Sequence, residues 1–285
     1  IYNISKREVR ALKTSNGSGE CCRIAHLIDL IKSSKEPIIG IPSNLEVVDF
    51  STLEEDKIGI ALNLYEGDGA QICKRGLSLK DQRKAMIQVA KGIMWLHKND
   101  IIHGDIKPPN FLIKNIGGEI EAIVNDFEGI QCREDIEDIV KRWEESTDAG
   151  EKDSLFLKFY GIFTQEYFPF IDQDSIRTTL REATTTKERQ CGIWNLLKAR
   201  DKYSFGESFI QMNLVSLPQE SRKFFRLWVD CLISNGVPDG LVNLVTNCVL
   251  LLYQGFSFEE ALKIVELKDY DFSKRSSLEE IVDVL

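Results

Sequence analysis

Hydrophobic residues form short β-branched runs near the start of the chain and recur at helical intervals through most of the remainder. The runs Val9–Leu12, Leu45–Phe50 and Ile58–Leu64 are bounded by Gly, Ser, Pro and Asp, which predicts three strands. Apolar residues three and four positions apart predict a helix at Glu20–Lys32, with Ser18 as its N-cap. A small β-rich unit is therefore expected first.

The chain beyond Gly67-Asp68-Gly69, which we expect to be a flexible joint, is predicted to be mostly helical. The apolar stripe of Leu79–His97 is wide enough to be buried. Two β-like runs, Phe111–Lys114 and Ala122–Val124, flank Gly117-Gly118 and predict a hairpin. Helical spacing also predicts Ile136–Glu145, Tyr203–Met212, Glu220–Ser234, Leu241–Tyr253 and Phe258–Leu267. The fold class is therefore α+β.

Composition narrows the class of partner. The 285 residues contain 36 Lys and Arg against 45 Asp and Glu, a net charge of −9, which argues against non-specific binding to nucleic acid or anionic membranes. Seven cysteines without a C-x-x-C pair and three scattered histidines predict no zinc site and a reduced, cytoplasmic environment. Polar residues interrupt the most apolar run, Leu241–Tyr253, so no membrane span is expected.

The segment Ile101–Gly129 carries the chemistry. Asp105, Lys107, Asn110 and Asp126 lie there within a loop and a hairpin. Mg²⁺ takes few protein oxygens and completes its shell with phosphates and water. A second carboxylate can accept a hydroxyl proton while an ammonium offsets phosphoryl charge. These side chains predict a magnesium-phosphate site.

Here the chain resembles Ser/Thr protein kinases. His103–Asn110 matches the catalytic-loop pattern H-x-D-x-K-P-x-N, and D-F-E-G at Asp126–Gly129 is similar to the magnesium-binding D-F-G element. The resemblance implies a two-lobed fold, with an N-lobe at residues 1–66, a C-lobe at 67–285, and ATP with Mg²⁺ or Mn²⁺ between them. It implies that Asp105 deprotonates the hydroxyl of a protein substrate and Lys107 steadies the γ-phosphate. Asn110 and Asp126 would hold the metal.

The resemblance extends into the N-lobe. V-R-A-L-K at Val9–Lys13 is similar to the strand whose Lys binds the α- and β-phosphates. Glu20 is the helix partner implied for Lys13, with His26 and Asp29 as alternatives. Leu62 would be the gatekeeper, and Asp68 would lie near the ribose. The implied nucleotide contacts are Lys13, Glu20, Ala11, Leu62, Leu64, Asp68 and Leu112. Ile1-Tyr2 is similar to the residues that follow the Gly-rich loop, so we expect that loop to precede Ile1.

Several positions depart from the pattern. Gly104 replaces the Arg of H-R-D, which predicts activity independent of activation-loop phosphorylation. Glu128 replaces a Gly, which predicts a more rigid D-F segment. Thr164 is the candidate for the activation-segment Thr. D-K-Y-S-F-G at Asp201–Gly206 resembles the motif whose buried Asp opens a central helix and braces the catalytic loop.

The stretch at residues 130–200 is expected to combine a divergent activation segment, which runs to about Pro169, with an insertion between Pro169 and Asp201, and to dock a regulatory partner. Its acidic part, Glu134–Asp153, would suit a basic substrate. One alternative is a pseudokinase scaffold that binds ATP or protein. Another is a small-molecule phosphotransferase, and a third is transfer of some other part of ATP. The mixture of a complete catalytic loop with degraded surroundings is similar to kinases of intracellular bacteria or viruses, which would place a secreted effector in the host cytosol.

Overall fold

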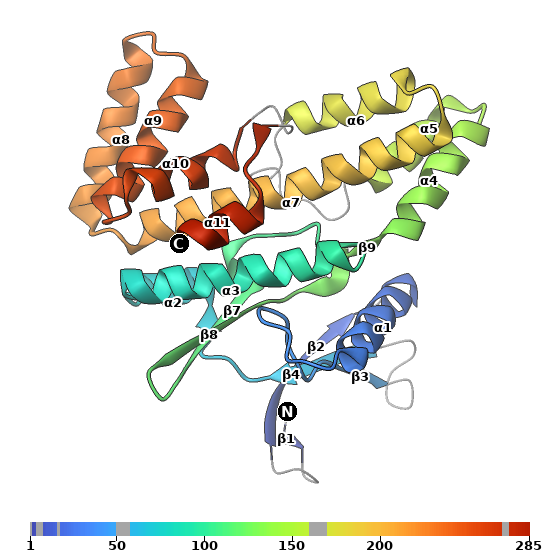
Figure 1. Ribbon diagram of the computed structural model, residues 1–285, viewed down its shortest axis with the longest axis horizontal. Helices are drawn as coiled ribbons and strands as arrows, with labels where there is room; N and C mark the ends of the chain where they lie inside the picture. Colours follow the sequence, from blue (N-terminus) through green and yellow to red (C-terminus); the bar gives the residue numbers. More distant parts are fainter. Residues whose placement is uncertain (1, 4–7, 16–17, 50–57, 160–169, 270–273) are drawn as a thin grey trace.

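The computed structural model describes the chain except for residues 1, 4–7, 16–17, 50–57, 160–169 and 270–273. It has a small part, a sheet with one helix beside it, and a larger part that is mostly helical (Figure 1). This arrangement confirms the predicted two-lobed α+β class. None of the helices in the described ranges is both long and apolar enough to cross a bilayer.

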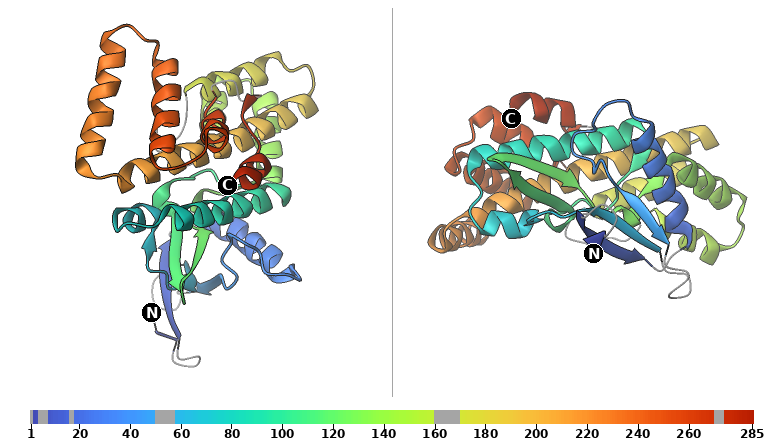
Figure 2. Two further views of the ribbon diagram at one scale, coloured as in Figure 1. Left: turned by 60° about the vertical axis from the view of Figure 1, so that its left-hand side comes forward. Right: turned by 90° about the horizontal axis from the view of Figure 1, so that it is seen from below.

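The small lobe contains an antiparallel sheet in the order β1-β2-β4-β3. Its strands are β1 (Tyr2–Asn3), β2 (Glu8–Ser15), β3 (Glu46–Asp49) and β4 (Ile58–Asn63), so the three predicted strands are confirmed. Helix α1 (Ser18–Ser33) lies beside this sheet (Figure 2). It begins at Ser18 itself, so Ser18 is the first helical residue and not the predicted cap. The buried Ile24 and Leu27 keep the predicted spacing.

The large lobe is built around α3 and α7 (Figure 1). Its short strands and turns are β5 (Gly67–Asp68), β6 (Ile101–Ile102), η1 (Pro108–Asn110), β7 (Phe111–Ile116), β8 (Glu119–Val124), η2 (Phe127–Gly129) and β9 (Gln131–Cys132). Its helices are α2 (Gly69–Lys74), α3 (Leu79–Lys98), α4 (Arg133–Glu145), α5 (Ala149–Lys158), α6 (Phe170–Glu182), α7 (Thr186–Ser216), α8 (Gln219–Ser234), α9 (Asp239–Tyr253), α10 (Phe258–Glu266) and α11 (Leu278–Val284). The predicted hairpin is confirmed as β7 and β8.

The expected flexible joint at Gly67-Asp68-Gly69 is wrong. Gly67 and Asp68 form β5, which pairs with β7, and Gly69 starts α2. The Oδ1 atom of Asp68 accepts a hydrogen bond from the backbone N–H of Gln71 at 2.8 Å, which caps this helix. The strand pairing involves a segment more than forty residues away, so local sequence could not reveal it.

Helix α7 is much longer than predicted. Thr185 and Glu188 form a capping box that starts the helix at Thr186, so Asp201 lies inside it and does not open it. The expectation that a helix begins near Asp201 is therefore wrong, because the cap is encoded about four turns earlier.

The described part of residues 130–200 consists mostly of helices. Helices α4, α5 and α6 pack with the first half of α7 around an apolar cluster of their own, at the right of Figure 1. Trp194 is 3% exposed within this cluster, and Trp143 packs against it, so both are packing residues of the lobe. The other buried members include Ile136, Val140, Phe156, Phe159, Ile176 and Leu180.

Two glycines allow the segment after α1 to cross α3 at close range. Gly40 has φ +81° and lies against Gly92 of α3, where a Cβ on Gly92 would be 2.4 Å from the Gly40 carbonyl oxygen. The same carbonyl oxygen accepts a hydrogen bond from the backbone N–H of Val124 at 2.8 Å. A side chain at either glycine would therefore separate the lobes' packed backbones.

We expect Gly92→Ala to destabilise the protein by about 1–3 kcal/mol, although alanine is the better helix former, because the added methyl overlaps backbone atoms. Thermal unfolding would measure this loss. Gly150→Ala in α5 is the control, since its methyl would meet only a side-chain oxygen at 3.2 Å. Equal melting temperatures for Gly92→Ala and the wild type would contradict the expectation.

Candidate active site

The loop after β6, together with η1, holds three of the predicted site residues close to one another. The Nζ atom of Lys107 lies 2.7 Å from Oδ2 of Asp105. The amide nitrogen of Asn110 donates to the same Oδ2 and to the Asp105 carbonyl oxygen, both at 2.8 Å. The side chains of Asp105 and Lys107 keep 12% and 22% of their surface exposed. The carboxylate is thus held in place while a reactant can still reach it.

Asp201 fixes the backbone of this loop. Its carboxylate accepts hydrogen bonds from the backbone N–H groups of His103 at 2.9 Å and Gly104 at 3.0 Å. Nε2 of His97 lies 2.9 Å from the same group. Burial opposes ionisation of Asp201, but the hydrogen bond from His97 and nearby positive charges outweigh it and lower the pKa of this carboxyl. The bracing role predicted for Asp201 is confirmed.

His103 has a structural position. Its Nδ1 accepts the backbone N–H of Asp105 at 3.3 Å, so Nε2 carries the hydrogen and donates to the Asn125 carbonyl oxygen at 2.9 Å. Burial is the main reason that the pKa of His103 is lowered. The imidazole is therefore neutral near pH 7 and joins two segments of the site.

The D-F-E-G element lies directly against the catalytic loop. The backbone N–H of Asn125 donates to the Asn110 carbonyl oxygen at 2.8 Å, which places Asp126 next to η1. Asp126 has φ +68°. The buried ring of Phe127 lies 5.6 Å from the His103 ring, centroid to centroid. The positive φ thus falls at Asp126, while Glu128 lies inside η2, so position 128 does not need glycine here.

Asn110 and Asp126 offer oxygen atoms that suit a hard divalent cation. Both hydrogen bonds of Asn110 are made by its nitrogen, which leaves its carbonyl oxygen as the atom that could bind a metal. Within the part of the chain that the structure describes, no three His, Cys, Asp or Glu side chains gather as a metal-binding group. Carboxylate and amide oxygens are donors that suit Mg²⁺, so Asn110 and Asp126 fit a Mg²⁺ ion that receives its remaining ligands from phosphates and water.

Several of the residues expected to contact the nucleotide lie on paired strands. Ala11 pairs with the buried Leu62 across β2 and β4, and Lys13 pairs with Ile60. Asp68 pairs with Leu112 across β5 and β7, and its carboxylate also caps α2.

The other predicted residues fall into two groups, those whose exposure is known and those whose side chains lie outside the described residues. Leu64 is 59% exposed between the lobes' strands. His26 and Asp29, the alternatives to Glu20, are exposed on α1. The side chains of Ala11, Lys13 and Glu20 are outside the described residues, as is the whole of Thr164.

Arg200 is a site residue that the sequence did not reveal. It is 1% exposed, and its Nη1 donates to the Phe159 carbonyl oxygen at 3.1 Å. A Cβ on Gly104 would lie 3.1 Å from the Arg200 Nη2 atom and 3.0 Å from the Gly129 carbonyl oxygen, and Gly104 has φ +79°. Position 104 therefore has no room for the arginine found there in the family pattern. Only the unexpected glycine in the motif signalled this change.

A two-lobed fold with this loop and the adjoining D-F-E-G element is typical of protein kinases. Residues 5–129 match the protein kinase domain family. Over these residues, which are less than half of the chain, the protein is similar to protein kinases.

Several serine/threonine-protein kinases are similar over part of the chain. GRIK2 of Arabidopsis thaliana is 35% identical over 79 residues, covering 28% of this chain and 18% of that protein. PknJ of Mycobacterium tuberculosis is 32% identical over 76 residues, covering 26% and 13%. ArnS of Sulfolobus acidocaldarius is 29% identical over 144 residues, covering 49% and 23%. The chain thus spans less than a quarter of each of these relatives.

Proposed function

We propose that this protein is a serine/threonine protein kinase that transfers the γ-phosphoryl group of ATP to a protein hydroxyl with Mg²⁺. The observation that carries the proposal is the shared contact of Asp105 with Lys107 and Asn110 beside the D-F-E-G element. A scaffold without catalysis would not require this combination of carboxylate, ammonium and amide. The match of residues 5–129 to the protein kinase domain family and the partial similarity of the chain to serine/threonine-protein kinases support the same conclusion.

In the proposed reaction, the Asp105 carboxylate orients the acceptor hydroxyl and accepts its proton as the oxygen attacks phosphorus. Lys107 carries a positive charge 2.7 Å from that carboxylate and steadies the charge of the transferred group. Asn110 and Asp126 would hold Mg²⁺, which supplies charge neutralisation at the phosphates. Lys13, with Glu20 as the partner we favour, would bind the α- and β-phosphates.

Two features bear on the alternatives. A small-molecule phosphotransferase remains a second candidate because glycine precedes the catalytic Asp, but Lys107 in contact with Asp105 favours a protein kinase. The acidic exposed surface of α4 favours a basic protein substrate. Its exposed acidic residues include Glu134, Asp138 and Glu145.

Radiolabelled ATP distinguishes these activities. The protein would be incubated with γ-labelled ATP and Mg²⁺, together with either a basic protein containing serine and threonine or a set of small alcohols. We expect label in phosphoserine or phosphothreonine, and its loss when the metal is removed with EDTA. Label found only in a small alcohol, or no transfer by folded protein that binds ATP, would overturn the proposal.

A further inference from the structure

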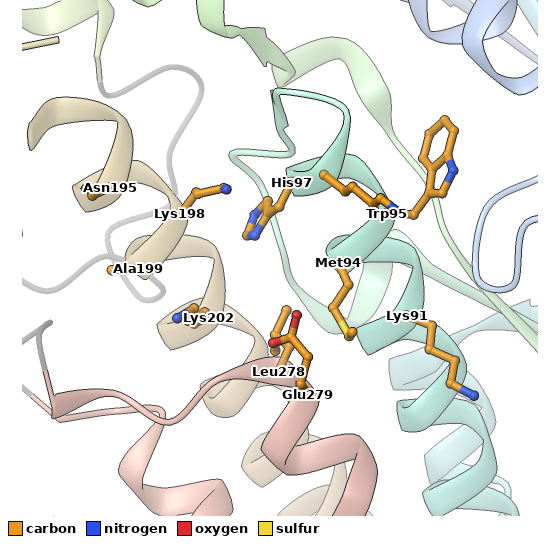
Figure 3. Close-up of a pocket in the computed structure, with 11 residues that line it drawn as sticks. Lys91, Met94, Trp95, His97, Asn195, Lys198, Ala199, Lys202, Leu278 and Glu279 are labelled. Atoms are coloured by element: carbon orange, nitrogen blue, oxygen red, sulfur yellow. The ribbon is translucent and has the colours of Figure 1, made fainter. Parts of the chain in front are cut away.

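A pocket apart from the catalytic loop lies in the large lobe, between α3, α7 and α11 (Figure 3). Its volume is about 660 Å³, within the usual range of small-molecule sites. Met94, Trp95, Ala199 and Leu278 give it an apolar wall. The pocket is thus large enough for a compact organic molecule.

The rest of its lining is basic. Four lysines line the pocket against one acid, Glu279, which gives a local charge of +3 in a chain whose net charge is −9. Elsewhere Lys84, Lys114 and Lys263 each reach a carboxylate within 4.0 Å. Among the described residues, the four lysines of the pocket form no such ion pair. They are Lys91, Lys98, Lys198 and Lys202.

Two of the lysines, Lys198 and Lys202, line the pocket from α7. In Figure 3 the amine of Lys198 points across the pocket toward His97, while the carboxylate of Glu279 points in from α11. Lys202 lies one turn further along α7 and is partly buried. Burial lowers its pKa, and the charges of Lys198 and Arg275 add to this effect, although Glu279 opposes it. Positive charge therefore accumulates here without full compensation.

We propose that this pocket binds a small phosphate monoester with an apolar or aromatic body, whose phosphate group is held by Lys198 and Lys202. Lysine is a common phosphate ligand that acts as a point charge, so two of them suit a dianion. The apolar wall formed by Met94 and Trp95 would contact the organic part. This site is separate from the catalytic loop and does not depend on the proposed phosphoryl transfer.

The position of His97 gives the site a route to the catalytic loop. His97 lies on the pocket wall, and its ring contacts Asp201, which holds the N–H groups of His103 and Gly104. An anion bound beside His97 would thus be connected, through the hydrogen bond between His97 and Asp201, to the residue that holds the catalytic loop.

Calorimetry with 1-naphthyl phosphate tests the proposal, with inorganic phosphate and 1-naphthol as the charged and the apolar halves of the probe. We expect the complete molecule to bind more tightly than either half. Replacing Lys198 and Lys202 together with Gln should weaken binding about tenfold or more, since both charges are removed. Replacing both with Arg should retain binding. The matched control is Lys141→Gln with Lys223→Gln, two exposed lysines on α4 and α8.

Lysine acetylation followed by mass spectrometry locates the probe and does not need a variant. We expect 1-naphthyl phosphate to protect Lys198 and Lys202, while Lys223 reacts as before. Protection of Lys107 alone would place the probe at the nucleotide site and overturn the proposal. Unchanged affinity in the folded double Gln variant would also overturn it.

Discussion

Asp105→Asn should reduce phosphoryl transfer by a factor of about 10²–10⁴, the usual contribution of a general base. The asparagine has nearly the same shape and can still accept a hydrogen bond from Asn110. It cannot take up the hydroxyl proton, and it removes the charge that faces Lys107 at 2.7 Å. Initial rates of transfer from γ-labelled ATP to a basic protein would measure the loss.

The control must separate loss of chemistry from loss of structure. Asp100→Asn removes a carboxylate from an exposed turn with φ +55°, which asparagine tolerates, and it should retain activity. Asp105→Asn should still bind Mg²⁺ and ATP, as measured by calorimetry. If Asp105→Asn kept more than half of the wild-type transfer rate, Asp105 would not be the base.

Asp201→Ala is expected to cost about 3–5 kcal/mol of unfolding free energy, because it removes one member of a buried, charged network. Two backbone N–H groups of the catalytic loop and the ring of His97 would lose their acceptor. Since His103 and Gly104, the loop residues just before Asp105, would no longer be held in place, the transfer rate should fall as well. Denaturant unfolding and the initial rate give the two readouts.

Asp201→Asn keeps the size of the side chain and tests positioning separately. The single side-chain oxygen of asparagine cannot accept hydrogen bonds from all three donors, which are His97 and the backbone N–H groups of His103 and Gly104. We therefore expect a folded protein with a lower kcat and a nearly unchanged KM for ATP. Asp230→Asn on the exposed side of α8 is the matched control. An Asp201→Asn variant with wild-type kcat would show that this brace does not position the loop.

Local sequence patterns predicted those elements whose structure depends on residues close together in the chain. The spacing of Ile24 and Leu27 identified α1, and the turn at Gly117-Gly118 identified the β7–β8 hairpin. The catalytic loop was readable because its motif is contiguous. Contacts between distant segments could not be predicted. Examples are the pairing of β5 with β7 and the separate apolar cluster around which α4, α5 and α6 pack with α7.

The candidate site divides in the same way. Asp105, Lys107 and Asn110 are close in sequence, and the structure brings their side chains into contact. Arg200 comes from a distant helix, so its approach to Gly104 depends on the packing of α7 beneath the loop. The pocket lined by Lys198 and Lys202 of α7 also forms only through that packing, together with the placement of α11.

The approach of Arg200 to Gly104 has a consequence for how this sequence can change. An arginine could not be accommodated at position 104 by a single substitution, because the backbone there has φ +79° and the neighbouring volume already holds a guanidinium. Two exchanges would have to occur together, and each alone would lower stability. Positions 104 and 200 are therefore coupled, so the residue tolerated at one depends on the residue at the other.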